Sequence, residues 1–132
     1  MMIERPEIES LLRALYDSRR RGDLDAVCRA FSRDALFQIA GAGQASPIVN
    51  RSTGINQFRP LLAVLVKTFK LSDLMILSLV IDNPKAAVHW RAKVYSKLAG
   101  TTVPTEFIDL IEIKDALVVS YMEFFVPYSL SA

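Results

Sequence analysis

The stretch AAVHWRAKVYSKLAGTTVPTEFIDLIEIKDALVVSYMEFFV, residues 86–126, decides the fold of this 132-residue chain. Apolar and polar residues alternate along it, and two turn signals, Ala99-Gly100 and Lys114-Asp115, divide it into three runs. Such alternation is typical of β-strands, and connections this short leave no room for crossover helices. The stretch therefore predicts an antiparallel meander over 86–98, 101–113 and 116–126.

The residues before this meander have helical spacing, interrupted by one strand-like run. The segments predicted there are a helix over 6–21, a second helix over 24–31, a short strand over 35–40, a loop of small residues over 41–47, a third helix from Ser52 or Thr53, and a strand over 71–82. Gly22 ends the first helix and Asp23 caps the second. Pro60 either kinks the third helix or marks a later start.

Helices followed by a meander predict one α+β domain over residues 1–132, with three N-terminal helices packed on one face of a bent antiparallel sheet. In the 86–98 run, Trp90 and its alternate neighbours would face the helices, and His89 and Arg91 would face outward. The last strand is apolar on both faces. We therefore expect a second subunit to cover the outer face, giving a homodimer.

Composition excludes several classes of protein. With 16 basic and 14 acidic residues the chain is too balanced to suggest a nucleic-acid partner, and its longest apolar run, 74–81, is too short for a membrane span. One cysteine, Cys28, and the absence of a signal-peptide pattern favour the cytoplasm. One cysteine with one histidine makes a metal site improbable. The basic run Arg19-Arg20-Arg21 is interpreted as a solvated helix end.

Asp109 is the strongest candidate for chemistry. It shares a strand face with the apolar residues Phe107 and Ile111, where a carboxylate is costly unless it is paired or neutralised. Burial would raise its pKa and let it act as a hydrogen-bond donor or general acid. The alternative is a structural acid tied to an Arg or Tyr on a neighbouring strand. Glu123 is the second candidate, as a carboxyl that pairs with Asp109 across adjacent strands or as a solvated rim residue.

The segment RRRGDLDAVCRAFSRDALFQIAG, residues 19–41, resembles the opening of ketosteroid isomerase-like and SnoaL-like proteins of the nuclear transport factor 2-like superfamily, and the later runs GINQFRPLL, AAVHWRA and EFIDLIEIKDALVVSYMEFF fit the same template. The resemblance implies a cone-shaped sheet wrapped around the helices, an apolar pocket at its open end, and dimers through the outer sheet face. The resemblance does little to identify a function, because the same fold hosts many activities.

The resemblance also locates the positions that steroid isomerases use. The general base falls on Ile39 and the oxyanion tyrosine on Leu15, while Tyr16 is adjacent and points about 100° away around the helix. The protonated acid falls on Asp109. Because one position of three survives, steroid isomerase activity is not expected. Limonene epoxide hydrolases of this fold use an Asp–Arg–Asp arrangement, but the nearest arginine considered, Arg91, is expected to face outward.

Two main hypotheses follow. The first is a cofactor-free acid–base enzyme of isomerase, cyclase, dehydratase or hydrolase type, acting through Asp109 and Glu123 on a small apolar molecule with one polar group. The residues expected to contact that ligand are Tyr16, Phe37, Ile39, Trp90, Phe107, Tyr121 and Phe125. The second is a non-catalytic ligand-binding or dimerisation module of the same fold. A protein-transport adaptor is a third, and no docking patch in the sequence favours it.

Overall fold

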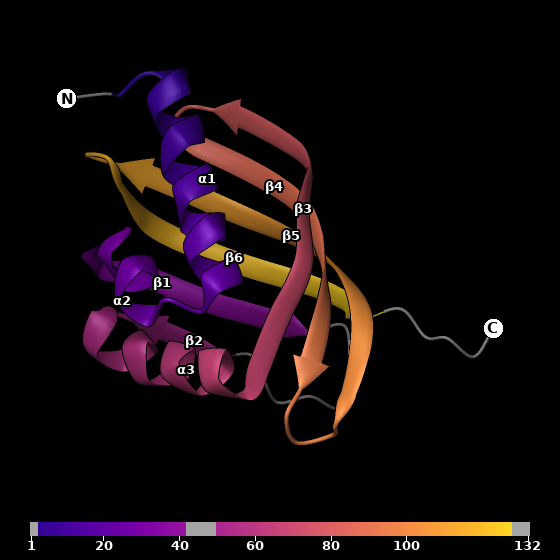
Figure 1. Ribbon diagram of the computed structural model, residues 1–132. Coiled ribbons are helices and arrows are strands. Elements are labelled where there is room, and N and C mark those ends of the chain that lie inside the picture. The colour runs from indigo at the N-terminus through magenta and orange to yellow at the C-terminus, as the bar shows by residue number, and fades with distance from the viewer. Residues whose placement is uncertain (1–2, 42–49, 128–132) are drawn as a thin grey trace.

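Figure 1 shows a computed structural model of the chain, which describes residues 3–41 and 50–127. Its elements are α1 (Arg5–Arg21), α2 (Leu24–Arg29), β1 (Phe31–Gly41), β2 (Asn50–Thr53), α3 (Ile55–Thr68), β3 (Phe69–Asp82), β4 (Lys85–Ser96), β5 (Thr101–Lys114) and β6 (Leu117–Pro127). The helices lie on the concave side of one bent sheet. The predicted α+β class and cone-like architecture are confirmed.

Helix α1 packs one of its faces against the sheet. It begins with a capping box between Glu4 and Glu7 and ends at Gly22, whose left-handed φ of 69° directs its N–H back to the carbonyl of Arg19. Its buried side chains include Ile8, Leu12, Leu15 and Tyr16. Because these recur at three- and four-residue intervals, one face of α1 lies on the sheet and the other faces solvent.

The six strands found in the described part of the chain run in the order β2-β1-β6-β5-β4-β3. The predicted meander β3 to β6 is antiparallel throughout, and Asp109 on β5 lies directly between Val88 on β4 and Glu123 on β6. The alternation predicted for β4 and β5 is confirmed, because Trp90, Phe107 and Asp109 are all buried. One pair differs from the expected antiparallel pattern: β1 runs parallel to β6.

Strand β3 is bent where its pairing to β4 is interrupted. The register shifts between Ser72 and Met75, and Asp73 within this bulge has a φ of 51°. An extra residue on one strand increases local twist and curvature. The bend allows β3 to close one side of the concave surface, as Figure 1 shows.

Three boundaries predicted from sequence are wrong: the end of the second helix, the start of the first strand and the start of the third helix. Strand β1 begins at Phe31, not at residue 35, because Phe31 is buried as a strand residue and α2 has already ended at Arg29. Residues 50–53 form β2, which delays α3 to Ile55. Pro60 lies inside α3 at an exposed position, so the carbonyl it leaves unbonded can be hydrated. Gly41 is the last residue of β1, and the rest of the loop predicted over 41–47 lies outside the described residues.

Candidate functional site

A cavity of about 370 Å³ opens between the C-terminal end of α1, helix α3 and the start of β3. Its apolar lining comes from all sides of the concave surface: Val27, Phe37, Ile39, Leu62, Leu65, Val66, Phe69, Leu71, Val94, Val103, Phe107 and Phe125. Among the described residues that line it, Glu123 is the only carboxylate. The volume and lining are typical of a small-molecule pocket with few polar groups.

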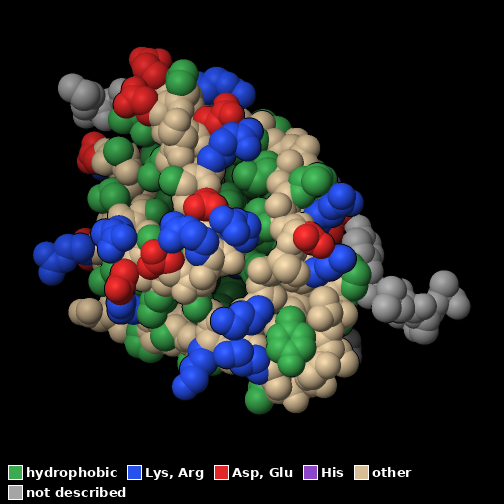
Figure 2. Space-filling model, in the orientation of Figure 1, with side chains coloured by type: hydrophobic (Ala, Val, Ile, Leu, Met, Phe, Trp, Pro, Cys, Tyr) green, Lys and Arg blue, Asp and Glu red, His purple; other side chains and the backbone are tan. Residues whose placement is uncertain are grey.

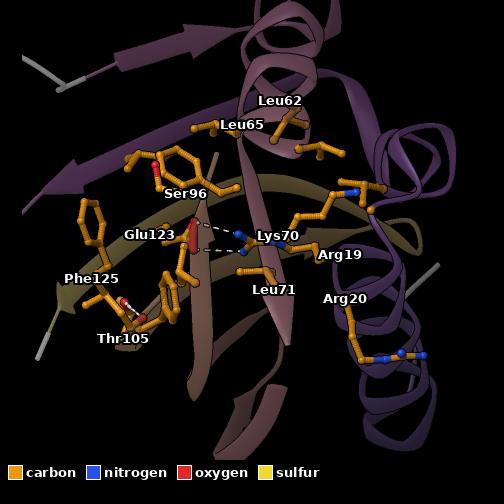
Figure 3. Close-up of a pocket in the computed structure, with 18 of the residues that line it drawn as sticks. Arg19, Arg20, Leu62, Leu65, Lys70, Leu71, Ser96, Thr105, Glu123 and Phe125 are labelled. Atoms are coloured by element: carbon orange, nitrogen blue, oxygen red, sulfur yellow. Dashed lines mark hydrogen bonds and ion pairs between the residues drawn. The ribbon is translucent and has the colours of Figure 1, made fainter. Parts of the chain in front are cut away.

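Glu123 is held by an arginine from a different element. Figure 3 shows the Arg19 guanidinium, from the last turn of α1, meeting the Glu123 carboxylate on β6. The Nη1–Oε1 distance is 3.1 Å and the Nη2–Oε2 distance is 3.3 Å. This two-point contact fixes the orientation of Glu123. The Arg19 side chain is 21% exposed, so the pair is largely shielded from water.

Asp109 lies behind this ion pair and is 0% exposed. Its Oδ2 atom accepts hydrogen bonds from the hydroxyls of Tyr16 and Tyr121 and, at 2.7 Å, from Nε1 of Trp90. Arg19 Nη1 lies 3.8 Å from the same oxygen and donates to the Tyr121 hydroxyl at 2.8 Å. Among the described residues, Oδ1 has no hydrogen-bond partner.

Burial raises the pKa of Asp109 to about 8, and the negative charge of Glu123 adds to the shift. The Arg19 charge and the tyrosine hydroxyls act in the opposite direction and are outweighed. Asp109 is therefore mainly protonated at pH 7. Because Oδ2 already accepts three hydrogen bonds, the proton of the neutral acid is expected on Oδ1.

Burial acts against the charge of Arg19, but the combined effect of Glu123, Tyr121 and Asp109 raises the pKa of Arg19 well above its usual value. The guanidinium also lies over the Trp90 ring, 4.8 Å from its centroid. With Asp109 neutral, the charges of Arg19 and Glu123 cancel. The buried cluster then carries no net charge.

The predicted site residues fall into two layers. Phe37, Ile39, Phe107, Phe125 and Glu123 line the cavity. Tyr16, Trp90, Asp109 and Tyr121 do not line it and form the buried cluster behind it. Trp90 stacks on Phe107 with ring centroids 3.8 Å apart, so Phe107 separates the indole from the cavity. The acid predicted at position 109 therefore reaches the cavity only through its neighbours.

The three positions that the resemblance assigns to steroid isomerase chemistry carry only part of the expected side chains. Ile39 lines the cavity as an apolar residue, so no base stands there. Leu15 is buried, and the adjacent Tyr16 supplies the hydroxyl that bonds Asp109. A tyrosine and a protonated acid do meet, but neither lines the cavity.

The interpretation of Arg19 as part of a solvated helix end is wrong, whereas Arg20 and Arg21 are half exposed as expected. Position 19 follows Leu15 by four residues and Leu12 by seven, which places it on the buried face of α1. This helical spacing is the feature of the sequence that predicts burial of Arg19. Arg91 and His89 face outward, as predicted, and His89 lies 3.4 Å from Glu106.

Over residues 3–41 and 50–127, no group of three or more His, Cys, Asp or Glu side chains is placed to hold a metal ion. In the same part of the chain, no helix combines the length and apolar content that crossing a membrane requires.

Comparisons with known proteins agree with the fold. The family pattern of the SnoaL-like domain matches residues 12–121. No curated protein sequence matches the chain. Solved structures that share the fold include a candidate isomerase from Bacillus subtilis, with a TM-score of 0.82, 17% identity, and coverage of 95% of this chain and 90% of that one.

Two further structures have a TM-score of 0.73. An LEH-like epoxide hydrolase from M. tuberculosis is 15% identical over 92% of this chain and 84% of its own. A protein of ketosteroid isomerase-like fold from Catenulispora acidiphila, in complex with trimethylamine, is 16% identical over 92% and 86%. At these identities the likeness concerns the fold alone.

Proposed function

Because the chain belongs to the SnoaL-like domain family, a small-molecule-binding fold, we propose that it binds a small, largely apolar molecule in the cavity and acts on it as a cofactor-free acid–base enzyme. The reaction classes that fit are isomerisation, cyclisation, dehydration and hydrolysis. One observation carries the proposal. The only carboxylate that lines the described cavity, Glu123, is held in place by Arg19 and surrounded by apolar side chains.

In this proposal Glu123 accepts a proton from the ligand or from a water molecule beside it. Arg19 orients the carboxylate, and the uncharged Asp109 supports Arg19 and Tyr121 from behind. Asp109, Arg19 and Glu123 form a carboxyl–arginine–carboxyl arrangement, which favours a hydrolase of the epoxide-opening kind among the four classes. Because Asp109 does not line the cavity, Glu123 takes the proton from the attacking water and, once protonated, returns it to the oxygen of the opened ring. The arginine comes from α1 and not from the sheet.

The test is turnover of a panel of small epoxides and α,β-unsaturated or enolisable ketones, followed by mass spectrometry. We expect Glu123→Gln to lower the turnover of any accepted substrate by about 10²-fold or more, because general acid–base groups contribute about that much. The matched control is Glu9→Gln, since Glu9 pairs with Arg13 on the exposed side of α1. Turnover that survives Glu123→Gln would refute the assigned chemistry.

A second candidate is a non-catalytic ligand-binding protein. Two observations favour it: the base position is the apolar Ile39, and Asp109 is sealed from the cavity. Saturable ligand binding with no turnover across the panel would select this alternative.

We propose a homodimer formed through the outer sheet face and, from the single cysteine, a cytoplasmic protein. The support for the dimer is the apolar character of that face. Ile108, Leu110, Phe124 and Val126 are between 40% and 54% exposed there, on the adjacent strands β5 and β6. Contiguous apolar area of this kind on a small protein is typical of an interface.

A further inference from the structure

The mouth of the cavity is lined by more cationic than anionic side chains, whereas its interior is mainly apolar. Of the described charged residues that line the cavity, four are cationic, Arg19, Arg20, Arg21 and Lys70, and one is anionic, Glu123. Figure 2 shows Lys and Arg side chains bordering a hollow on this face of the molecule. The question is which of these charges remain free to meet a ligand.

Ion pairs account for the three arginines. Arg19 is neutralised by Glu123. Arg20 and Arg21 contact Asp17 at 2.7 and 3.0 Å, and Arg21 also contacts Asp23 at 3.1 Å. Two arginines therefore share two aspartates at the rim, and their charges largely cancel.

Lys70, at the start of β3, is the exception. It is exposed, it lines the cavity, and it forms no ion pair within residues 3–41 and 50–127. Lys67 precedes it at the end of α3, and the backbone N–H of Lys97 bonds the carbonyl of Thr68 nearby, but neither of these two lysines lines the cavity. The mouth thus presents at least one uncompensated cation above an apolar interior.

The C-terminal end of α1 lies at the same mouth, and its dipole favours cations. Two of its carbonyls are already satisfied, because the N–H groups of Gly22 and Asp23 bond Arg19 and Ser18. The three arginines in the last turn of α1 offset the partial negative charge of the carbonyls that remain unbonded. A cationic ligand group would gain nothing at Lys70, and to reach Glu123 it would have to displace Arg19.

On these grounds we propose that the ligand of this cavity is an amphipathic anion, whose apolar body occupies the interior and whose carboxylate or similar anionic group lies at the mouth beside Lys70. The inference rests on the proposed ligand-binding function and adds the charge class of the ligand. Lys70 then acts as a specificity-determining residue, separate from the Arg19–Glu123 pair.

The test compares three probes with one apolar body, 2-naphthoate, 2-naphthol and 2-naphthylmethylamine, by isothermal titration at pH 7 and low salt. We expect the carboxylate to bind about fivefold more tightly than the alcohol, and the amine to bind less tightly than the alcohol. Lys70→Gln should abolish the advantage of the carboxylate. Lys114→Gln, which removes the same charge at the distant β5–β6 turn, should preserve it.

The outcomes separate the two proposals. Leu65→Trp, which fills the cavity from α3, should weaken all three probes if they bind there. Equal affinity for the three probes, tighter binding of the amine, or an advantage unchanged in Lys70→Gln would overturn the anion inference and leave ligand binding intact. Failure of all three probes to bind the wild-type protein would overturn both.

Discussion

Arg19 joins the two carboxyl groups that the sequence singles out. It contacts Glu123 on the cavity side and lies 3.8 Å from Asp109 on the buried side. The acids could be predicted from their strand alternation, because a carboxyl on an apolar face is unusual. The arginine could not be chosen from the basic run by charge alone, since Arg20 and Arg21 are chemically identical to it. Only the helical spacing distinguishes it.

Removing Arg19 should be costly. Arg19→Met leaves Glu123 shielded and unpaired, and we expect the free energy of unfolding to fall by about 3 kcal/mol. The double variant Arg19→Met/Glu123→Leu should recover most of that loss, because no uncompensated charge remains. The control is Arg13→Met, which breaks the exposed pair with Glu9 and should cost about 0.5 kcal/mol or less. Urea unfolding measures all four proteins, and equal losses for Arg13 and Arg19 would contradict the account.

Asp109 should make stability depend on pH. Its pKa in the folded protein, about 8, lies above the unfolded value of about 3.9, so between these limits the folded state holds a proton that the unfolded state has released. The free energy of unfolding should therefore fall as pH rises through this window, by up to about 1.4 kcal/mol per pH unit from this group.

Asp109→Asn should remove this contribution. Urea unfolding of both proteins at pH 5, 6, 7 and 8 should show the wild type losing stability relative to the variant as pH rises. A stability difference between the two proteins that stays constant over this pH range would mean that Asp109 is ionised in the folded protein as well and that the three donors to Oδ2 outweigh burial.

At the scale of elements, the strands with strict alternation were predicted to within a few residues. Strands β4 and β5 follow that rule, and Gly22 marked the end of α1. The missed features depend on distant partners. Residues 50–53 have no strand alternation of their own and form β2 because β1 offers them an edge. The parallel pairing of β1 with β6 joins residues that are 84 to 87 positions apart in the sequence, such as Phe31 with Val118 and Leu36 with Ser120, and no local pattern reports such a pairing.

The end of α1 positions Arg19, so its cap should matter. Gly22 has a φ of 69°, and a Cβ there would meet Val66 Cγ1 at 3.6 Å, an ordinary contact. Gly22→Ala should therefore cost about 1 kcal/mol of stability through backbone strain alone. Gly22→Asn should cost less, because Asn tolerates the left-handed conformation. Thermal unfolding compares the two variants, and an equal loss would point to crowding at Val66.

At the scale of the whole molecule, the bent sheet has two apolar faces with different tasks. The concave face packs against the helices and forms the cavity. We expect the convex face to form the dimer, so Ile108→Glu or Phe124→Glu should convert the protein to monomers. Light scattering after size exclusion measures the mass. Leu98→Glu, at an exposed turn, is the control and should leave the mass unchanged. A wild-type monomer would refute the dimer.

The central claim is that the concave face encloses a ligand site. The most direct measurement is a methyl NMR titration of the wild-type protein with 2-naphthoate. We predict saturable shifts at Leu62, Leu65 and Val94, which line the cavity, and none at Leu110 or Val80 on the convex face. Shifts confined to the convex-face methyls, or no saturable shift at the cavity methyls, would contradict the account.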